Sequence, residues 1–454
     1  MEIKNHSALV RGSRRREDIL SIVRSGIEAV LPQNVIGNAL KLNGDVLYMT
    51  GKEYDLKGYR HIYVAGGGKA SGTMALELEK LLGGRITAGI VNDRYSSDVH
   101  TNIIKVNKAG HPLPTQDGVR GVKMMLDMLS DAGRDDLVIF LISGGGSALL
   151  PYPAGGIGLE DMIRLTDSLL RSGARIAEIN VIRKHISMIK GGMLLRAVNG
   201  AEVLSLVVSD VVGDDISFIA SGPTAPDGTT YSDAINILRK YDLYWQAPET
   251  IRKHLEEGAE GIIAETPKPG DRLFDRVTNV IIASNIIALK AAGQKAQELG
   301  YTPLILGSYI TGESKDVALV HAGIARECHI TGTPLKAPAA IISGGETTVT
   351  IRGRGKGGRN EEFVLGFLQG YVPGTTVVSI DTDGIDGLTD VSGAIADETT
   401  MPRAIEKGLS IERALADNSS YDFFYALDDL VITGPTGTNV SDMRVILVYG
   451  PIEK

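Results

Sequence analysis

Two glycine-rich loops in this sequence combine a flexible backbone with side chains that can do chemistry. Residues 66–70 read Gly-Gly-Gly-Lys-Ala, and residues 143–148 read Ser-Gly-Gly-Gly-Ser-Ala. Glycines let backbone N–H groups approach an anion closely, and the N-terminus of a following helix adds partial positive charge. Both loops therefore predict binding of a phosphate or a carboxylate. The candidate residues are Gly67, Gly68, Lys69, Ser143, Gly144, Gly145, Gly146 and Ser147.

A carboxylate follows a third apolar run. Asp210 lies just after residues 203–208, where an expected strand ends. A carboxylate at such a position can accept the proton of a substrate hydroxyl or bind Mg²⁺. Asp214 and Asp215, slightly further on, are interpreted as residues that cap a helix and are solvated. Asp210 is therefore the candidate base.

More acidic residues follow two later apolar runs. Glu346 comes after the sequence Ser-Gly-Gly, and Asp381 and Asp383 share an Asp/Gly-rich loop. Oxygen ligands of this kind suit Mg²⁺. We expect Glu346, Asp381 and Asp383 to hold the metal, directly or through water.

A basic loop lies between these acidic segments. Residues 352–359 contain four cations separated by glycines, and the loop opens onto an expected helix. Arginine forks and lysine charges at such a place suit the clamping of a polyphosphate. Arg359 is the candidate catalytic cation, and Asn360 is a candidate for binding substrate or nucleotide.

The composition is that of an ordinary globular protein. The chain has 454 residues, 43% of them hydrophobic and 22% charged, which fits two or three domains. The net charge of −8 offers no global basic field for nucleic acid or anionic lipid. Cys328 is the single cysteine, the first residues lack the apolar core of a signal peptide, and no stretch approaches the ~18 apolar residues of a membrane span. We expect a cytoplasmic protein with small-molecule partners, no nucleic acid and no membrane.

Apolar runs alternate with helical patterns along the first part of the chain. Such alternation predicts a mostly parallel sheet covered by helices. Strands are expected at 61–65, 87–91, 102–106, 137–142 and 203–208. Helices are expected at 15–31, 71–82, 116–130, 160–171, 176–188 and 232–240.

A change of composition at residues 256–276 predicts an exposed connector. We therefore expect two domains, at 1–265 and 266–454. In the second, strands are expected at 279–283, 302–306, 339–342, 347–351, 376–380 and 444–448. Helices are expected there at 286–299, 314–327 and 360–368. The last strand could pair with either sheet.

The first glycine loop matches no standard nucleotide motif. The Walker A pattern is absent, and a dinucleotide fingerprint would need its third glycine one place before Gly72. Asp93, at the end of the next expected strand, nevertheless leaves an NAD(P)-dependent reductase open. His111, in the sequence Gly-His-Pro-Leu-Pro, is interpreted as part of a structured turn.

Taken together, these motifs resemble those of the glycerate 2-kinases, in the class with a C-terminal MOFRL domain. The resemblance covers nearly the whole chain. It rests on residues 65–70, 110–114, 143–148, 209–211, 221–224, 343–347, 357–361 and 381–384. It implies an N-terminal Rossmann-like domain, with a mostly parallel sheet and helices on both faces, and a smaller C-terminal α/β domain.

The resemblance also implies an activity, the ATP- and Mg²⁺-dependent conversion of D-glycerate to 2-phosphoglycerate in a cleft between the domains. The functionally important lysine and arginine of the family fall on Lys69 and Arg359. We assign these two to the phosphoryl oxygens or the glycerate carboxylate, and the loop at 143–147 to one of the same anions.

Two other functions remain open at this point. One is an NAD(P)-dependent hydroxypyruvate reductase, and the other is a non-catalytic regulator that binds a nucleotide or a sugar phosphate. The surplus of cations and carboxylates disfavours both. The sequence leaves open whether the chain forms a homo-oligomer.

Overall fold

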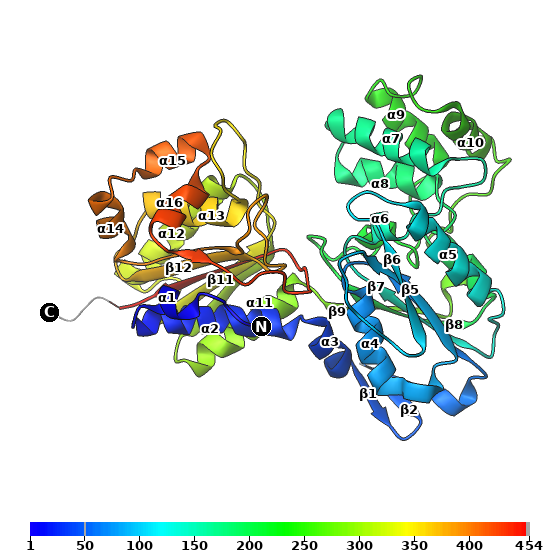
Figure 1. Cartoon of the computed structure of the whole chain (residues 1–454), viewed down its shortest axis with the longest axis horizontal. Helices are drawn as coiled ribbons and strands as arrows, with labels where there is room; N and C mark the ends of the chain where they lie inside the picture. Colours follow the sequence, from blue (N-terminus) through cyan, green and yellow to red (C-terminus); the bar gives the residue numbers. More distant parts are fainter. Residues whose placement is uncertain (50, 451–454) are drawn as a thin grey trace. The chain divides into compact units, whose positions relative to one another are not determined.

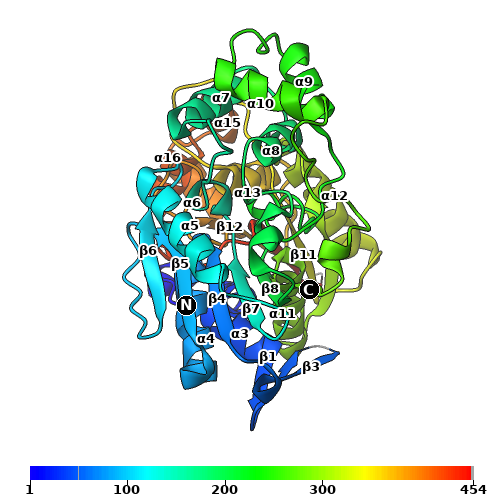
Figure 2. The same ribbon diagram turned by 90° about the vertical axis from the view of Figure 1, so that its right-hand side faces the viewer.

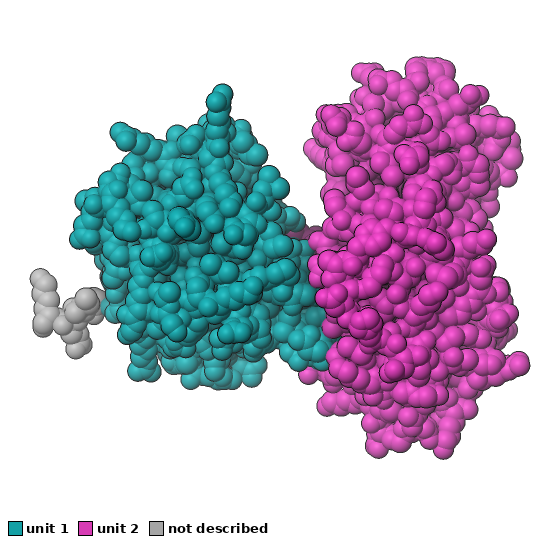
Figure 3. All heavy atoms as spheres, viewed as in Figure 1, with its two compact units in different colours: residues 1–34, 283–454 teal, residues 35–282 magenta. Residues whose placement is uncertain are grey.

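A computed structural model describes residues 1–49 and 51–450, which form two compact units (Figures 1 and 3). Unit 2 comprises Val35–Ile282, and unit 1 comprises Met1–Asn34 together with the chain from Ala283 onward. This differs from the expected division at 265/266. The N-terminal helices belong to unit 1, because the apolar face of α2 (Arg14–Ala29) packs in its core.

Unit 2 contains a six-stranded sheet in the order β6-β5-β4-β7-β8-β9, and most of this order can be followed in Figure 2. Its strands are β4 (Ile62–Gly67), β5 (Ala88–Arg94), β6 (Ile104–Ala109), β7 (Leu137–Ile142), β8 (Glu202–Val208) and β9 (Val277–Ala283). The pairs β6/β5, β5/β4, β4/β7 and β7/β8 are parallel, as the alternating pattern predicted. The expected strand at 279–283 is β9, which joins this first sheet rather than the second.

Helices cover both faces of the parallel sheet. Asn92 and Asp93 are neighbours on β5, so their side chains point to opposite faces. Asn92 donates to the carbonyl of Gly118 in α5 (Gln116–Leu129) at 2.9 Å, whereas Asp93 faces α4 (Ser71–Leu82). The two helices therefore lie on opposite sides of β5.

Further helices form a layer of their own in unit 2 (green in Figure 1). They are α7 (Leu159–Arg171), α8 (Ile176–His185), α9 (Tyr231–Lys240) and α10 (Glu249–Ala259). Ile179, Leu238 and Ile251 are buried between them. α10 extends into the expected connector, and a small antiparallel sheet of β1 (Leu40–Asn43), β2 (Val46–Met49) and β3 (Lys52–Asp55) was also not predicted. The short helices α3 (Pro32–Ala39) and α6 (Gly146–Leu149) complete the list of α-helices described in this part of the chain.

Unit 1 contains a mixed sheet in the order β10-β11-β15-β12-β13-β14. Its strands are β10 (Thr302–Ile310), β11 (Ala339–Gly345), β12 (Thr375–Asp381), β13 (Gly393–Ala396), β14 (Leu430–Val431) and β15 (Asp442–Val448). The last strand lies in the middle of this sheet, antiparallel to β11 and β12, which settles the question left open by the sequence. The expected strand at 347–351 does not form: Thr348 makes only an isolated bridge with Glu313, and the Thr350 N–H bonds to the Glu313 side chain instead of a neighbouring strand.

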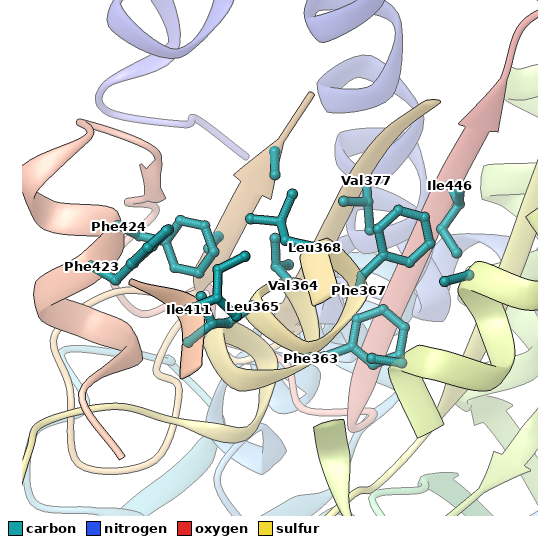
Figure 4. Close-up of a cluster of buried hydrophobic side chains, with 14 of the residues drawn as sticks. Phe363, Val364, Leu365, Phe367, Leu368, Val377, Ile411, Phe423, Phe424 and Ile446 are labelled. Carbon is teal, nitrogen blue, oxygen red and sulfur yellow. The ribbon is translucent and has the colours of Figure 1, made fainter. Parts of the chain in front are cut away.

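Two hydrophobic cores lie on the two faces of this sheet. Ala339 and Ile341 contribute to one core, and Ala340 and Ile342 to the other, as alternation along β11 requires. The helices of unit 1 are α1 (His6–Val10), α2, α11 (Asn285–Glu298), α12 (Ser314–Thr331), α13 (Arg359–Gln369), α14 (Thr400–Glu406), α15 (Ile411–Asp417) and α16 (Ser420–Ala426). Figure 4 shows the core beneath α13, where Phe363 and Phe367 lie among aliphatic side chains. This packing holds the N-terminus of α13, and with it Arg359, at the edge of the sheet.

None of the helices in the described part of the chain is both long enough and apolar enough to span a membrane.

Candidate active site

Three of the predicted site segments follow neighbouring parallel strands of unit 2. Lys69 comes after β4, Ser143 after β7 and Asp210 after β8. β4 is paired with β5 on one side and with β7 on the other. In open α/β sheets, ligands bind at the carboxyl ends of the strands where the strand order reverses. The carboxyl ends of β4 and β7 are therefore the expected position for a ligand.

The two glycine loops are bonded to each other. The Lys69 N–H donates to the Gly144 carbonyl at 2.9 Å, and the Ala70 N–H donates to Ser143 Oγ at 3.0 Å. Gly68 has φ +149°, and a Cβ there would lie 2.4 Å from the Ser143 carbonyl oxygen. Only glycine permits this approach, which places the two loops side by side as one structure.

Asp210 lies against the second loop. A Cβ on Gly144 would lie 2.1 Å from Oδ2 of Asp210, so the carboxylate occupies the space that a side chain would take. The candidate base and the amide-rich loop are thus in direct contact. A hydroxyl bound at this loop would lie within reach of a proton acceptor.

His111 joins Lys69 at the same loop. A Cβ on Gly145 would lie 3.0 Å from Cγ of Lys69 and 3.0 Å from Cδ2 of His111. Burial lowers the pKa of His111 to about 4, and the charges of Lys69 and Arg94 contribute to this shift. The imidazole is therefore neutral at physiological pH and can donate one hydrogen bond and accept another. Sequence reasoning treated His111 only as part of a turn, although its motif was among those that carried the resemblance.

Ser147, in the second glycine loop, contacts a strained turn that contains Ala220 and Ser221. Its Oγ lies 3.0 Å from Oγ of Ser221, which donates to Oδ1 of Asn180 at 3.1 Å. Ala220 and Ser221 both adopt left-handed backbone conformations, with φ of 52° and 61°. Such strain in non-glycine residues is concentrated at functional sites.

Arg359 is the centre of the candidate site in unit 1. Its guanidinium donates to Asp442 Oδ1 at 2.8 Å, to Glu346 Oε1 at 2.8 Å and to Asp381 Oδ2 at 2.7 Å. Burial alone would lower the pKa of Arg359, but the charges of Asp442, Asp381 and Glu346 outweigh burial and raise it. In this structure the positive charge is thus neutralised by side chains of the same unit.

Asp442 and Asp386 organise the surroundings of Arg359, and the sequence analysis missed both. Asp442 accepts a further bond from Arg444 Nη2 at 2.6 Å, and Asp386 accepts from the N–H groups of Asn360 and Glu361 at the start of α13. Asp442 opens an apolar strand and Asp386 lies in a turn, so neither carries a local signal. Only the pairing of β15 with β11 and β12 brings Asp442 to the other residues.

Asn360 lies inside the network around Arg359. Its side chain is fully buried, donates to Asp442 at 2.9 Å and Asp386 at 3.1 Å, and accepts from Ser379 at 2.6 Å. These bonds hold the amide between the two carboxylates. Binding of substrate or nucleotide by Asn360 stays a prediction.

The predicted metal ligands do not meet as one three-carboxylate group. Glu346 and Asp381 are both paired with Arg359, while Asp383 accepts from Asn439 at a long 3.5 Å. Among the described residues, no group of three or more His, Cys, Asp or Glu side chains is arranged to hold a metal ion. Burial raises the pKa of Asp381 well above its usual value, and the nearby charges of Asp383 and Asp442 raise it further. The crowding of carboxyl groups at this end of the sheet therefore disfavours the charged form of Asp381 when no cation other than Arg359 is bound.

The basic loop before α13 does not form the expected cluster of four cations. Arg352 and Arg354 are exposed, and Lys356 pairs with Asp390 at 3.2 Å and lies over the ring of Tyr421. Arg359 is the member of this loop that the structure places in the candidate site.

Comparisons with known proteins cover almost the whole chain. Residues 18–256 match a family model described as a domain of unknown function (DUF4147), and residues 339–442 match the MOFRL family. A glycerate 2-kinase from Pyrococcus horikoshii is 41% identical over 95% of this chain and 97% of its own length. A putative hydroxypyruvate reductase from Agrobacterium vitis is 42% identical over 85% of this chain and 86% of its own length. The crystal structure of a glycerate kinase from Thermotoga maritima is similar, with a TM-score of 0.84 and 34% identity over 95% of this chain and 99% of the other.

Proposed function

The chain belongs to the glycerate 2-kinase family with a C-terminal MOFRL domain, and we propose that it transfers the γ-phosphate of ATP to the C2 hydroxyl of D-glycerate. The products are 2-phospho-D-glycerate and ADP. The observation that carries this proposal is the meeting of Lys69, the amide-rich loop at 143–147 and Asp210 at adjacent strand ends. Cations, backbone donors and a base for a hydroxyl are the groups that phosphoryl transfer requires.

The proposed steps assign one task to each group. The C2 oxygen attacks the γ-phosphorus, its proton passes to the carboxylate of Asp210, and the bond from the γ-phosphorus to the bridging oxygen of ADP breaks. Lys69 and Arg359 neutralise negative charge on the phosphoryl oxygens as it develops. The N–H groups of the loop at 143–147 hold one of the anions. These roles are supported by charge, by contact between the loops and by their place in the sheet.

Mg²⁺ fits the donor set in unit 1. Asp381, Asp383 and Glu346 offer the carboxylate oxygens that this ion prefers, and Mg²⁺ in nucleotide enzymes usually takes one or two carboxylates together with phosphate oxygens. When bound there, it would neutralise charge on the phosphates. Arg359 would then exchange its bonds to Glu346 and Asp381 for bonds to phosphate oxygens, and Asp442 would keep it in place.

The reductase alternative is kept because the Agrobacterium vitis relative bears that name. In a dinucleotide site, the acidic residue at the end of the neighbouring strand bonds to a ribose hydroxyl. Here that residue is Asp93, which is 1% exposed and faces α4, where a Cβ on Gly72 would lie 2.2 Å from Oδ2. This burial disfavours the reductase.

One experiment separates the candidate functions. The purified chain is incubated with ATP, Mg²⁺ and D-glycerate, ADP is measured by a coupled assay, and the product is identified by NMR. We expect 2-phosphoglycerate, and no NADH or NADPH oxidation when hydroxypyruvate is supplied. Oxidation of NADH with no ADP release would replace the kinase by the reductase, and binding of ATP without turnover would favour the regulator. The cytoplasmic location stays a prediction from the sequence, and whether the chain forms a homo-oligomer stays open.

A further inference from the structure

A buried cation, Lys190, and a partly exposed one, Arg183, are neighbours in unit 2 and take no part in the roles assigned so far. Lys190 follows α8 in the chain and is 1% exposed, and Arg183 lies on α8 itself. The Lys190 ammonium donates a long, weak hydrogen bond to the Ala220 carbonyl oxygen at 3.4 Å. An ammonium can donate three hydrogen bonds, so this group is poorly satisfied.

Neither cation has a carboxylate partner. Within the described part of the chain, no Asp or Glu forms an ion pair with Lys190 or Arg183. The neighbouring Lys184 is different, because it pairs with Asp227 at 3.3 Å. Burial, together with the positive charge of Arg183, lowers the pKa of Lys190 to about 7. Burial also lowers the pKa of Arg183. A buried ammonium beside a second positive charge is unfavourable without an anion, and a bound anion would relieve it.

The pair adjoins the candidate active site of unit 2. Ala220, which accepts the bond from Lys190, is so close to the glycine loop that a Cβ on Gly146 would lie 2.6 Å from its own Cβ. The next residue, Ser221, contacts Ser147 of the same loop at 3.0 Å. Only the turn at Ala220 and Ser221, whose backbone is left-handed at both residues, therefore lies between Lys190 and the second glycine loop.

We propose that Lys190 and Arg183 form an anion subsite that binds the carboxylate of the hydroxy-acid substrate. The proposal rests on the proposed function, and it names the residues that recognise the acid. The carboxylate would accept the hydrogen bond that Lys190 now donates to the Ala220 carbonyl oxygen. Arg183 is partly exposed, so the substrate would enter beside it, and its planar guanidinium matches the shape of a carboxylate.

A carboxylate fits this place better than a phosphate does. Lys190 is 1% exposed, and the guanidinium of Arg183 beside it is a planar fork that matches a carboxylate. The subsite also presents charged side chains, while the amide-rich loops with Lys69 already offer what phosphates require. Binding at Lys190 would leave the hydroxyl groups of the acid near Ser147 and Ser221.

The test is ligand-induced thermal stabilisation of the whole chain, with D-glycerate, ADP, inorganic phosphate and the uncharged analogue glycerol as separate probes. We expect D-glycerate to raise the melting temperature of the wild type and glycerol to leave it unchanged at equal concentration. In Lys190→Met, which keeps the volume and removes the charge, we expect the glycerate concentration for half-maximal shift to increase at least tenfold, and the response to ADP to persist. Arg183→Gln should act in the same direction.

Lys184→Met is the matched control, because its buried ammonium already has a carboxylate partner. This variant should be less stable, yet it should keep the wild-type response to glycerate. A Lys190→Met variant that loses the response to ADP or phosphate but keeps that to glycerate would assign the subsite to a phosphate and overturn the proposal.

The parent function is tested separately by turnover. If the wild type phosphorylates and binds glycerate, and Lys190→Met binds it with unchanged affinity, the subsite alone is wrong. If the wild type neither binds nor phosphorylates glycerate, both proposals are wrong.

Discussion

Nε of Arg359 donates to Oδ1 of Asp442 at 2.8 Å, across 83 positions of sequence, and the Asp442 side chain is fully buried. The other oxygen of Asp442 accepts from Arg444, which is also buried. One carboxylate therefore compensates two guanidinium groups, one of which faces the candidate site. The orientation of Arg359 depends on this residue.

Replacing Asp442 by Asn should affect both stability and catalysis. The variant keeps the shape of the side chain but leaves Arg444 buried without a counter-charge, and breaking a buried ion pair of this kind costs about 3–5 kcal/mol. We expect a large fall in the melting temperature and, in protein that remains folded, a lower kcat with a smaller change in KM. Thermal denaturation and steady-state kinetics measure the two effects.

Asp390→Asn is the control for this variant, since Asp390 pairs with Lys356 at the surface with 75% of its side chain exposed. Exposed pairs contribute less than about 1 kcal/mol. Equal effects of the two substitutions would show that the buried network around Arg359 has no special part.

Lys69→Ala should remove catalysis with little change in folding. The loop backbone is held by glycines and by bonds to Gly144 and Ser143, which the substitution leaves in place. We expect kcat/KM to fall by roughly 10²-fold or more, equivalent to about 2.7 kcal/mol of transition-state stabilisation. Steady-state kinetics with varied ATP and glycerate provide the measurement.

Lys80→Ala, on the helix that follows the loop, is the control, because its side chain is 60% exposed and paired only within the helix. It should keep wild-type kinetics. Normal kinetics of Lys69→Ala as well would leave the glycine loop as a structural turn.

The kinase activity should require a divalent cation. EDTA should abolish activity, and added Mg²⁺ should restore it. Asp381→Asn and Glu346→Gln should raise the Mg²⁺ concentration needed for half-maximal activity, and Asp381 should have the larger effect because its carboxylate is almost fully buried whereas Glu346 is about half exposed. Titration of activity with Mg²⁺ at saturating ATP measures this requirement.

If both variants retain the wild-type Mg²⁺ requirement, Glu346 and Asp381 are partners of Arg359 and not of the metal. Asp383 and then Asp210 would be the next residues to test.

Lys190 should make the stability of the ligand-free protein depend on pH. Burial and the charge of the neighbouring Arg183 together lower its pKa from 10.5 to about 7 in the folded state. Between these two pH values the unfolded chain binds more protons than the folded chain at this residue, so its contribution to stability rises with pH. Below pH 7 the folded protein bears the full cost of burying the charge.

Lys190→Met should therefore be more stable than the wild type at pH 6.5, and the difference should shrink as the pH rises toward 10. Denaturant unfolding of both proteins across this pH range measures the difference between their free energies of unfolding. Groups that titrate equally in both proteins do not contribute to this difference. A difference that stays constant with pH would mean that Lys190 does not titrate in this range and would weaken the argument for an uncompensated charge.

Much of the molecule follows from local sequence patterns. The helix at Ser71–Leu82 and the strand at Leu137–Ile142 form as predicted, because their apolar residues recur at helical spacing or in one buried run. The glycine loops were recognisable for a similar reason, since closely grouped glycines with Lys69 or Ser143 have few structural purposes other than close approach of backbone. The family was identifiable from the same motifs.

Other features arise only when distant segments meet. The amide of Asn360 could not be assigned to Asp442 and Asp386 from the sequence, because the strand register of β15 decides that contact. The first 34 residues join unit 1, where the apolar face of α2 is buried. The sequence did not predict this, because an apolar helix face does not indicate which surface it packs against.

The sequence by itself thus determined the fold class, the family and the loops that carry Lys69, Asp210 and Arg359, since these depend on residue type and short-range spacing. The tertiary structure alone decided which charges are compensated. Among the described residues, Arg359 has three carboxylate partners and Lys190 has none. This difference affects what each cation can bind, and it depends on burial and on contacts between segments far apart in the chain.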